Sequence, residues 1–248
     1  MWWLFVAAIR QYHNAPLQKV VVKIDHHKGF RFVEEKDILA RIAFVLGDSS
    51  LKCKTAEIPL LKIEQDLDAH PFIRKAQVYI DQQQNIVIEV TQERPVLRII
   101  NHDGTNCFLT DINTLIPVSN SCPVRLPVVL GQVITQSPER DSAVQYSLFE
   151  FINILSRDTF LKAFVDQIWV DENGEVSLIP LCGNHEVKLG LLQDNIQEKL
   201  KRLKIFYKDV LPAKGWETYK EINLRYRGQL VCVKNELQAD SSFLKPKI

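Results

Sequence analysis

The chain has 248 residues, of which 46% are hydrophobic and 25% are charged. This composition is ordinary for a folded protein and excludes disordered, collagen-like and coiled-coil classes, while the length favours two domains. The 31 lysine and arginine residues nearly balance the 30 aspartate and glutamate residues, and no long tract of like charge stands out, so nucleic acid is not expected as a partner.

The chain begins with an apolar run, Met1 to Ile9 (MWWLFVAAI), followed at once by the polar residues Arg10 to His13. Such a run is too short to cross a bilayer, because a spanning helix needs about 20 apolar residues. A signal peptide would place positive charge before the run. We interpret residues 1–17 as the outer end of a membrane helix whose beginning is missing; the alternatives are a start-site artefact or a short strand.

A compact sheet with two helices on one face is predicted for residues 18–95. Residues 19–25 (KVVVKID) have the β-branched composition of a strand, and apolar residues such as Ile38 and Ile42 recur at helical spacing. On both sides of the polar turn Gln82 to Asn85, apolar and polar residues alternate, which indicates a hairpin. The predicted order is strand, helix, helix, strand, strand, over residues 19–25, 34–46, 59–69, 76–81 and 86–91.

From residue 96 the pattern changes to short strands with frequent turns, and residues 96–233 are predicted to form a second domain. Ser137 and Pro138 predict the beginning of a helix, with Ser137 as its N-cap. Asn173 and Gly174 lie between two apolar runs and are a strong hairpin signal. A long helix is predicted from Leu192 to Val210, ended by Pro212 and Gly215, and strands are predicted at residues 96–100, 107–109, 116–118, 168–170, 175–179 and 186–189.

One long strand, Tyr219 to Val233 (YKEINLRYRGQLVCV), is predicted as the last ordered element. Ile222, Leu224 and Tyr226 alternate with polar residues, and Gly228 is expected to shift the alternation through a β-bulge. Residues 234–248 are polar and show no periodicity, so a flexible tail is predicted there.

The motifs that mark common enzymes are missing from the sequence. It has no glycine-rich nucleotide or phosphate loop and no Gly-x-Ser-x-Gly nucleophile motif. The five cysteines are scattered and have no spacing with histidine that would hold zinc. We therefore expect no enzymatic activity, no cofactor and no metal, and a disulfide between Cys107 and Cys122 is left open.

Particular segments resemble a known pair of domains. Ile63 to Asp81 (IEQDLDAHPFIRKAQVYID) and Ile86 to Pro95 (IVIEVTQERP) are similar to the helix and closing strands of a POTRA domain, so that residues 18–100 resemble that module. The rest of the chain resembles the β domain of the FtsQ/DivIB family of bacterial cell-division proteins. This second resemblance is carried, in order, by Phe108 to Val118, Leu126 to Gly131 (LPVVLG), Val187 to Gly190 (VKLG) and Ile222 to Tyr226 (INLRY).

The resemblance implies an α+β fold in which a POTRA domain precedes a mixed α/β domain with a largely antiparallel sheet. It also implies a single-pass inner-membrane protein, with its bulk in the periplasm at the division septum, that scaffolds septal peptidoglycan synthesis. Family members bind coiled-coil partners of the FtsB and FtsL type, mainly through the last strand of the β domain. The alternative is a POTRA-containing chaperone component of an outer-membrane assembly or secretion system.

A partner-binding site is therefore expected on the last strand. A strand at a sheet edge has unpaired N–H and C=O groups, to which an extended partner can add. Tyr226 offers contact area, Arg225 a donor for a carboxylate, and Gly228 a close backbone approach; the competing interpretation makes Tyr226 a core residue and Arg225 a solvated one. The expected site residues are Arg225, Tyr226, Gly228, Leu230, Val231 and Val233.

Overall fold

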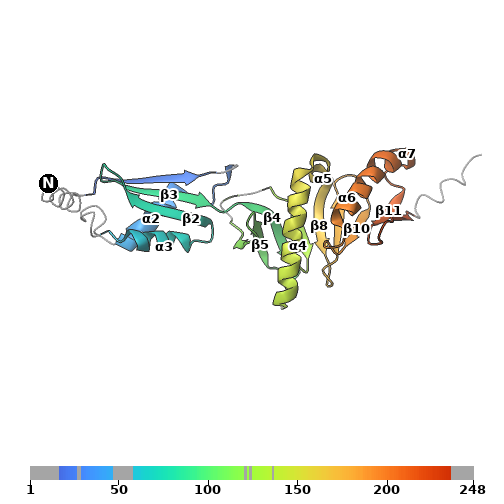
Figure 1. Ribbon diagram of the computed structural model, residues 1–248, viewed down its shortest axis with the longest axis horizontal. Helices are drawn as coiled ribbons and strands as arrows, with labels where there is room; N and C mark the ends of the chain where they lie inside the picture. Colours follow the sequence, from blue (N-terminus) through green and yellow to red (C-terminus); the bar gives the residue numbers. More distant parts are fainter. Residues whose placement is uncertain are drawn as a thin grey trace, which may run out of the picture. The chain divides into compact units, whose positions relative to one another are not determined.

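The computed structural model describes residues 17–26, 29–46, 58–119, 122, 125–135 and 137–235. These residues fall into two compact units that divide between Arg94 and Pro95, with Ser119 and Cys122 in the first (Figure 1). Within the described ranges, no helix is both long and apolar enough to cross a membrane.

Two predictions fall mostly on residues outside those ranges. Of the membrane-helix end predicted at residues 1–17, only Leu17 is described. Of the tail predicted at residues 234–248, only Lys234 and Asn235 are described, and Lys234 is the last residue of a strand rather than part of a tail.

The first unit is a three-stranded sheet with two helices on one side (Figure 1). The central strand is β3, which pairs in parallel with β1 and antiparallel with β2. The predicted order of strand, helix, helix, strand, strand is confirmed, with the elements β1 (Val20–Asp25), α2 (Glu35–Leu46), α3 (Leu60–Asp68), β2 (Ile73–Ile80) and β3 (Ile86–Gln92).

The core of this unit follows from the apolar spacing in the sequence. Ile38 and Ile42 from α2, and Ile63 and Leu67 from α3, are buried at helical spacing. At the beginning of the central strand, Ile86, Val87 and Ile88 are all buried, so the run there is continuous rather than alternating.

The second unit is a nine-stranded, mostly antiparallel sheet whose strand order is β12-β11-β10-β9-β8-β7-β4-β5-β6. The parallel pairs are β4 with β7, β7 with β8, and β10 with β11. Its strands are β4 (Pro95–Asn101), β5 (Asn106–Thr110), β6 (Leu115–Pro117), β7 (Val128–Gly131), β8 (Val165–Val170), β9 (Val176–Pro180), β10 (Glu186–Gly190), β11 (Tyr219–Asn223) and β12 (Val231–Lys234).

The helices of the second unit contribute buried apolar residues to the same core as the sheet. Leu148 and Phe151 of α4, together with Leu200 and Leu203 of α6, belong to the cluster formed by the buried strand residues. The α+β class expected from the sequence is therefore confirmed. The helical elements are α4 (Pro138–Arg157), α5 (Thr159–Phe164), α6 (Ile196–Ile205), the π-helical turn η4 (Phe206–Val210) and α7 (Leu211–Lys214).

The helix predicted from Leu192 to Val210 has different bounds in the structure. It begins only after Asn195, which adopts a left-handed conformation with φ of 47°, while Leu192 is buried in the preceding turn. Pro212 does not end the helical path, because η4 leads directly into α7, which contains the proline as its second residue and continues to Lys214. The chain leaves the helix at Gly215, where φ is 97°.

The single long strand predicted from Tyr219 to Val233 is wrong. The structure has two antiparallel strands there, β11 and β12, joined by residues 224–230. Arg225, Tyr226 and Gly228 therefore lie in a connection and not in a strand. A register shift does occur, but it lies between Tyr219 and Glu221 rather than at Gly228.

Two smaller predictions also differ from the structure. Ser137 precedes α4 as expected, but its side chain caps no described N–H group. Near this end of the helix, the Asp141 carboxylate accepts two hydrogen bonds from Thr135, one from its N–H at 2.8 Å and one from the Thr135 hydroxyl at 2.7 Å. Cys107 and Cys122 are both free, so they form no disulfide with each other.

Candidate partner-binding edge of the second sheet

Among the residues that the structure describes, strand β12 lies at one edge of the nine-stranded sheet and has a strand neighbour, β11, on one side only. An edge strand leaves a row of N–H and C=O groups to which another strand can add. The opposite edge is β6, which spans only Leu115–Pro117 and ends in a proline, so it offers a shorter row. The β12 edge is therefore the better candidate for strand addition.

The hydrogen bonds of β11 show which of its backbone groups face β12. The Leu224 N–H donates to the carbonyl oxygen of Lys188, in β10, at 2.8 Å. Backbone groups along a strand face its two neighbours in turn, so Glu221 and Asn223 face β12. The residues paired with these two in β12 must direct their own N–H and C=O groups back to β11.

The residues paired with them are Val233 and Val231. A second hydrogen bond gives the same alternation, because the Asn235 N–H donates to the carbonyl oxygen of Thr218 at 2.9 Å. The alternate residues of β12 have N–H and C=O groups that point away from the sheet, and these are Cys232 and Lys234.

An apolar hollow of about 400 Å³ lies beside β12 on the side of the helical segment α6–η4. Ile205, 49% exposed, lies on its helical side, and the half-buried Cys232 on its strand side. Burial raises the pKa of the Cys232 thiol, so this cysteine is uncharged at neutral pH. The residues that line the hollow are Arg202, Ile205, Phe206, Val210, Leu230 and Cys232.

The other face of β12 exposes two valines beside a charged pair. Val231 and Val233 are 42% and 38% exposed and share their face with the side chains of Asn223 and Glu221. The Glu221 carboxylate lies 2.8 Å from the Lys188 ammonium group. Their hydrogen bond raises the pKa of Lys188 and lowers the pKa of Glu221, so both stay charged at neutral pH.

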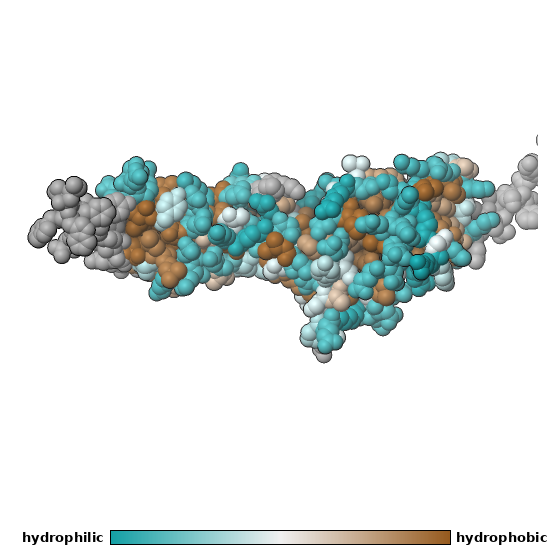
Figure 2. All heavy atoms as spheres, viewed as in Figure 1, coloured by the Kyte–Doolittle hydropathy of each residue, from teal (hydrophilic) through white to brown (hydrophobic). Residues whose placement is uncertain are grey.

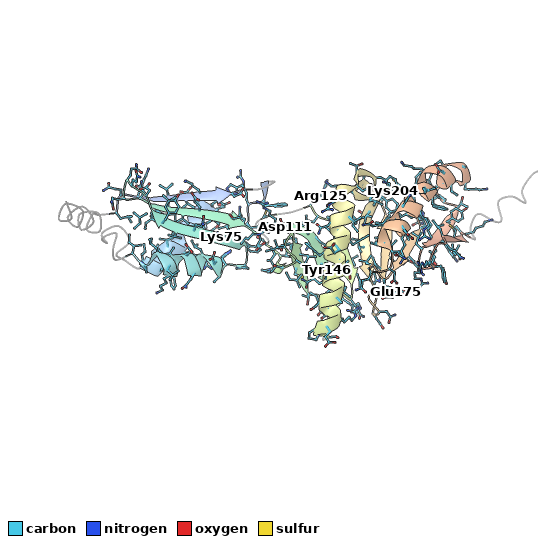
Figure 3. The ribbon with its side chains drawn as sticks, viewed as in Figure 1. Lys75, Asp111, Arg125, Tyr146, Glu175 and Lys204 are labelled. Carbon is cyan, nitrogen blue, oxygen red and sulfur yellow. The ribbon has the colours of Figure 1, made fainter. Side chains whose placement is uncertain are left out.

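Arg225 has internal partners that the sequence did not predict. Its guanidinium Nη1 donates to Glu175 Oε2 at 3.0 Å, and its backbone N–H donates to Asn223 Oδ1 at 3.1 Å. Glu175 follows the Asn173-Gly174 turn between β8 and β9 and is labelled in Figure 3. The arginine thus joins the connection after β11 to the β8–β9 hairpin.

Tyr226 and Gly228 lie at the exposed tip of the same connection. Tyr226 is 55% exposed, and its carbonyl oxygen accepts from the Gln229 N–H at 3.2 Å, which closes a turn. Gly228 has φ of 74°, a conformation that favours glycine. Neither the competing interpretation of Tyr226 as a core residue nor the prediction of a strand position holds in the structure.

The structure places the six predicted site residues in three settings. Arg225, Tyr226 and Gly228 lie in the connection, Leu230 lines the hollow, and Val231 and Val233 lie on the edge strand. Sequence reasoning missed the outward-facing backbone of Cys232 and Lys234 and the helical side of the hollow. Ile205 carried a detectable signal, because it is an apolar residue that does not fit the helical stripe of Leu200, Leu203 and Phe206.

Three ionisable groups of the second unit, Lys199, His185 and Tyr207, are buried in its interior. Lys199 is buried and donates to the carbonyl oxygen of Leu189 at 2.7 Å, and burial lowers its pKa. His185 is hydrogen-bonded to the Tyr207 hydroxyl; burial lowers the pKa of the histidine and raises that of the tyrosine. These contacts are structural. Among the residues that the structure describes, no group of three or more His, Cys, Asp or Glu side chains could hold a metal ion.

The fold defines a protein in which a POTRA-like module is followed by a larger, mostly antiparallel sheet with an exposed edge strand. Comparison with family profiles gives the same division: a POTRA-like domain matches residues 17–91, and the family described as FtsQ/DivIB, C-terminal related, matches residues 94–233. The chain belongs to this FtsQ/DivIB-related family, which confirms the resemblance in its sequence. A comparison with curated proteins finds no match.

Membership in this family makes the chain a division-associated scaffold protein and points to a membrane protein of the division site. The family is non-enzymatic. The matched residues include β11, the connection after it and β12 as far as Val233, so all of the candidate edge except Lys234 belongs to the part of the chain that the family shares.

Proposed function

We propose that this protein recruits and regulates septal peptidoglycan synthesis by binding small coiled-coil division proteins of the FtsB and FtsL type at the β12 edge. A single-pass helix anchors it in the inner membrane, with the bulk of the chain in the periplasm. The observation that supports the proposal best is the outward-facing backbone of Cys232 and Lys234 beside an apolar hollow. The division family also matches the sheet from β4 to Val233 in β12, which favours this function over outer-membrane assembly.

Strand addition at this edge would use both faces of the added strand. Its N–H and C=O groups would bond with those of Cys232 and Lys234, while its side chains alternate between the two faces of the sheet. Those on the helical side would fill the hollow beside Ile205, and those on the other side would lie next to Val231 and Val233. The main-chain bonds supply affinity, and the hollow supplies specificity for an apolar side chain.

Amide hydrogen exchange tests this proposal directly. The chain is titrated with the extracytoplasmic segment of the FtsB-type protein from the same organism, and exchange is followed residue by residue. We expect new protection at the outward-facing amides of Cys232 and Lys234, with no change at Val78 and Val90 in the first unit. If a saturating partner leaves Cys232 and Lys234 exchanging as fast as in the free protein, binding at this edge is excluded.

A further inference from the structure

The two ends of the first unit's sheet can be told apart by strand pairing. Val20, the first residue of β1, pairs with Ile86, which also pairs with Ile80 at the close of β2. At the opposite end, Ile73 pairs with Gln92. We call the end that holds Val20 the leading end, since the chain enters β1 there.

Helix α2 runs from the opposite end toward the leading end. Its beginning is tied down by Gln92, whose side-chain oxygen accepts from the N–H groups of Phe32 and Val33 at 2.9 Å each. Twelve helical residues cover about 18 Å, close to the length of the six-residue strand β1. The last turn of α2, which contains Phe44, therefore lies at the leading end.

Helix α3 begins at the same end of the unit at which α2 ends. Its last residue, Asp68, accepts from the Ala76 N–H at 2.7 Å near the beginning of β2, so its first turn points to the leading end. Arg41 in α2 lies 3.0 Å from Asp66 in α3, as expected for two antiparallel helices. Leu61, in the first turn of α3, thus lies at the same end as Phe44.

These two side chains are unusually exposed for apolar residues. Phe44 is 87% and Leu61 is 68% exposed, and among the described large apolar side chains only Leu181, at 67%, comes close. Figure 2 shows hydrophobic surface gathered over the α2–α3 part of the first unit. Single exposed apolar residues are common, but two that share one end of a small domain indicate a contact surface.

The sequence before β1 contains the apolar run on which the proposed membrane anchorage rests. The apolar run Met1 to Ile9 is separated from Leu17 by residues 10–16 alone, and such a segment spans at most about 30 Å even when fully extended. Lys19 directly precedes Val20, and Lys62 directly follows Leu61. Lysine beside exposed apolar residues is typical of chains that lie against lipid headgroups.

We propose that the leading end of the first unit is a bilayer-contact surface, in which Phe44 and Leu61 enter the interfacial region of the membrane. The inference rests on the membrane anchorage proposed above, because the tether keeps the unit close to the lipid. This contact is between the first unit and the bilayer alone and needs no protein partner. Its two apolar side chains would reach the boundary between headgroups and acyl chains, about 5–10 Å deep.

Tryptophan quenching by brominated lipids tests the contact on the full chain reconstituted in vesicles. The variants Phe44→Trp and Leu61→Trp place a reporter at the surface. Lys36→Trp is the matched control, because Lys36 lies on the same helix at the opposite end and its side chain is 76% exposed. We expect bromolipids to quench the added emission of Phe44→Trp about twofold or more relative to Lys36→Trp.

The natural tryptophans Trp2 and Trp3 separate the two possible failures. If the parent chain shows no quenching that these two residues can account for, the proposed anchorage is wrong. If they are quenched but Phe44→Trp and Leu61→Trp respond no more than Lys36→Trp, the anchorage stands and the bilayer contact is refuted. Comparing the quenching of Phe44→Trp in vesicles with and without anionic lipid then shows how much Lys19 and Lys62 contribute to the contact. Quenching of Phe44→Trp that disappears entirely without anionic lipid would contradict apolar insertion.

Discussion

Replacing Lys234 by proline is the sharpest perturbation of the β12 edge. The N–H of Lys234 points away from β11, so proline removes a donor that bonds to no neighbouring strand in the described part of the chain. It also restricts Val233 to the extended conformation that Val233 already has. Prolines are accepted on edge strands for this reason. We expect the free energy of unfolding to change by no more than about 0.5 kcal/mol.

The same substitution removes a bond that an added strand would make. A main-chain hydrogen bond contributes about 0.5–1.5 kcal/mol net, and about 1.4 kcal/mol corresponds to a tenfold change in affinity. The proline ring also occupies the side from which the added strand approaches. We therefore expect the dissociation constant for the partner segment, measured by titration calorimetry, to rise about tenfold or more.

Two controls make this result interpretable. Lys234→Ala removes the side chain but keeps the outward N–H, so it should bind as the parent does. Val233→Pro removes an N–H that faces β11 and should instead lower the free energy of unfolding by about 1–3 kcal/mol. If Lys234→Pro stays folded and binds as tightly as Lys234→Ala, strand addition at this edge is refuted.

Three further substitutions test other parts of the second unit. Ile205→Glu, in the hollow, should weaken partner binding about tenfold with little change in thermal unfolding, because Ile205 is half exposed. Tyr226→Ala should leave the fold intact and, in the same titration, weaken binding only if the partner reaches the exposed turn. Asp158→Ala removes a carboxylate that caps α5 and pairs with Lys204, and it should lower the melting temperature. The hydrogen bond from Lys204 lowers the pKa of Asp158, so this contribution is present above the ordinary pKa of 3.8 and is lost as the pH falls through the lower folded value; melting curves of the two proteins should converge there.

Local periodicity predicted most elements correctly because each depends on residues close in the sequence. The alternation on both sides of Gln82 to Asn85 predicted β2 and β3, and Asn173-Gly174 predicted the turn between β8 and β9. In that turn the Asp171 carboxylate accepts from the N–H groups of Asn173 and Glu175, which holds the hairpin closed. Such patterns can be recognised in the sequence because the turn and its strands are built from one short segment.

The last strand was mispredicted because alternation alone does not show where a strand ends. Leu224 continues the apolar phase of Ile222 and is fully buried, but it follows the end of β11, and its N–H donates to Lys188 in β10. Arg225 looked free for a partner, but it reaches Glu175, 50 residues away in the sequence. A contact between residues so far apart in the chain produces no periodic pattern in the sequence from which it could be predicted.

The sequence by itself determined the α+β class, the family, and the apolar run that suggests an anchor, because composition, periodicity and motif order are properties of the chain alone. Only the tertiary structure decided that β12 is an edge strand, that the N–H and C=O groups of Cys232 and Lys234 point away from the sheet, and that Ile205 and Cys232 line the same hollow. The physical reason is that a strand's hydrogen-bonding partner is set by the packing of distant segments. A row of backbone groups becomes available to a partner only where that packing ends.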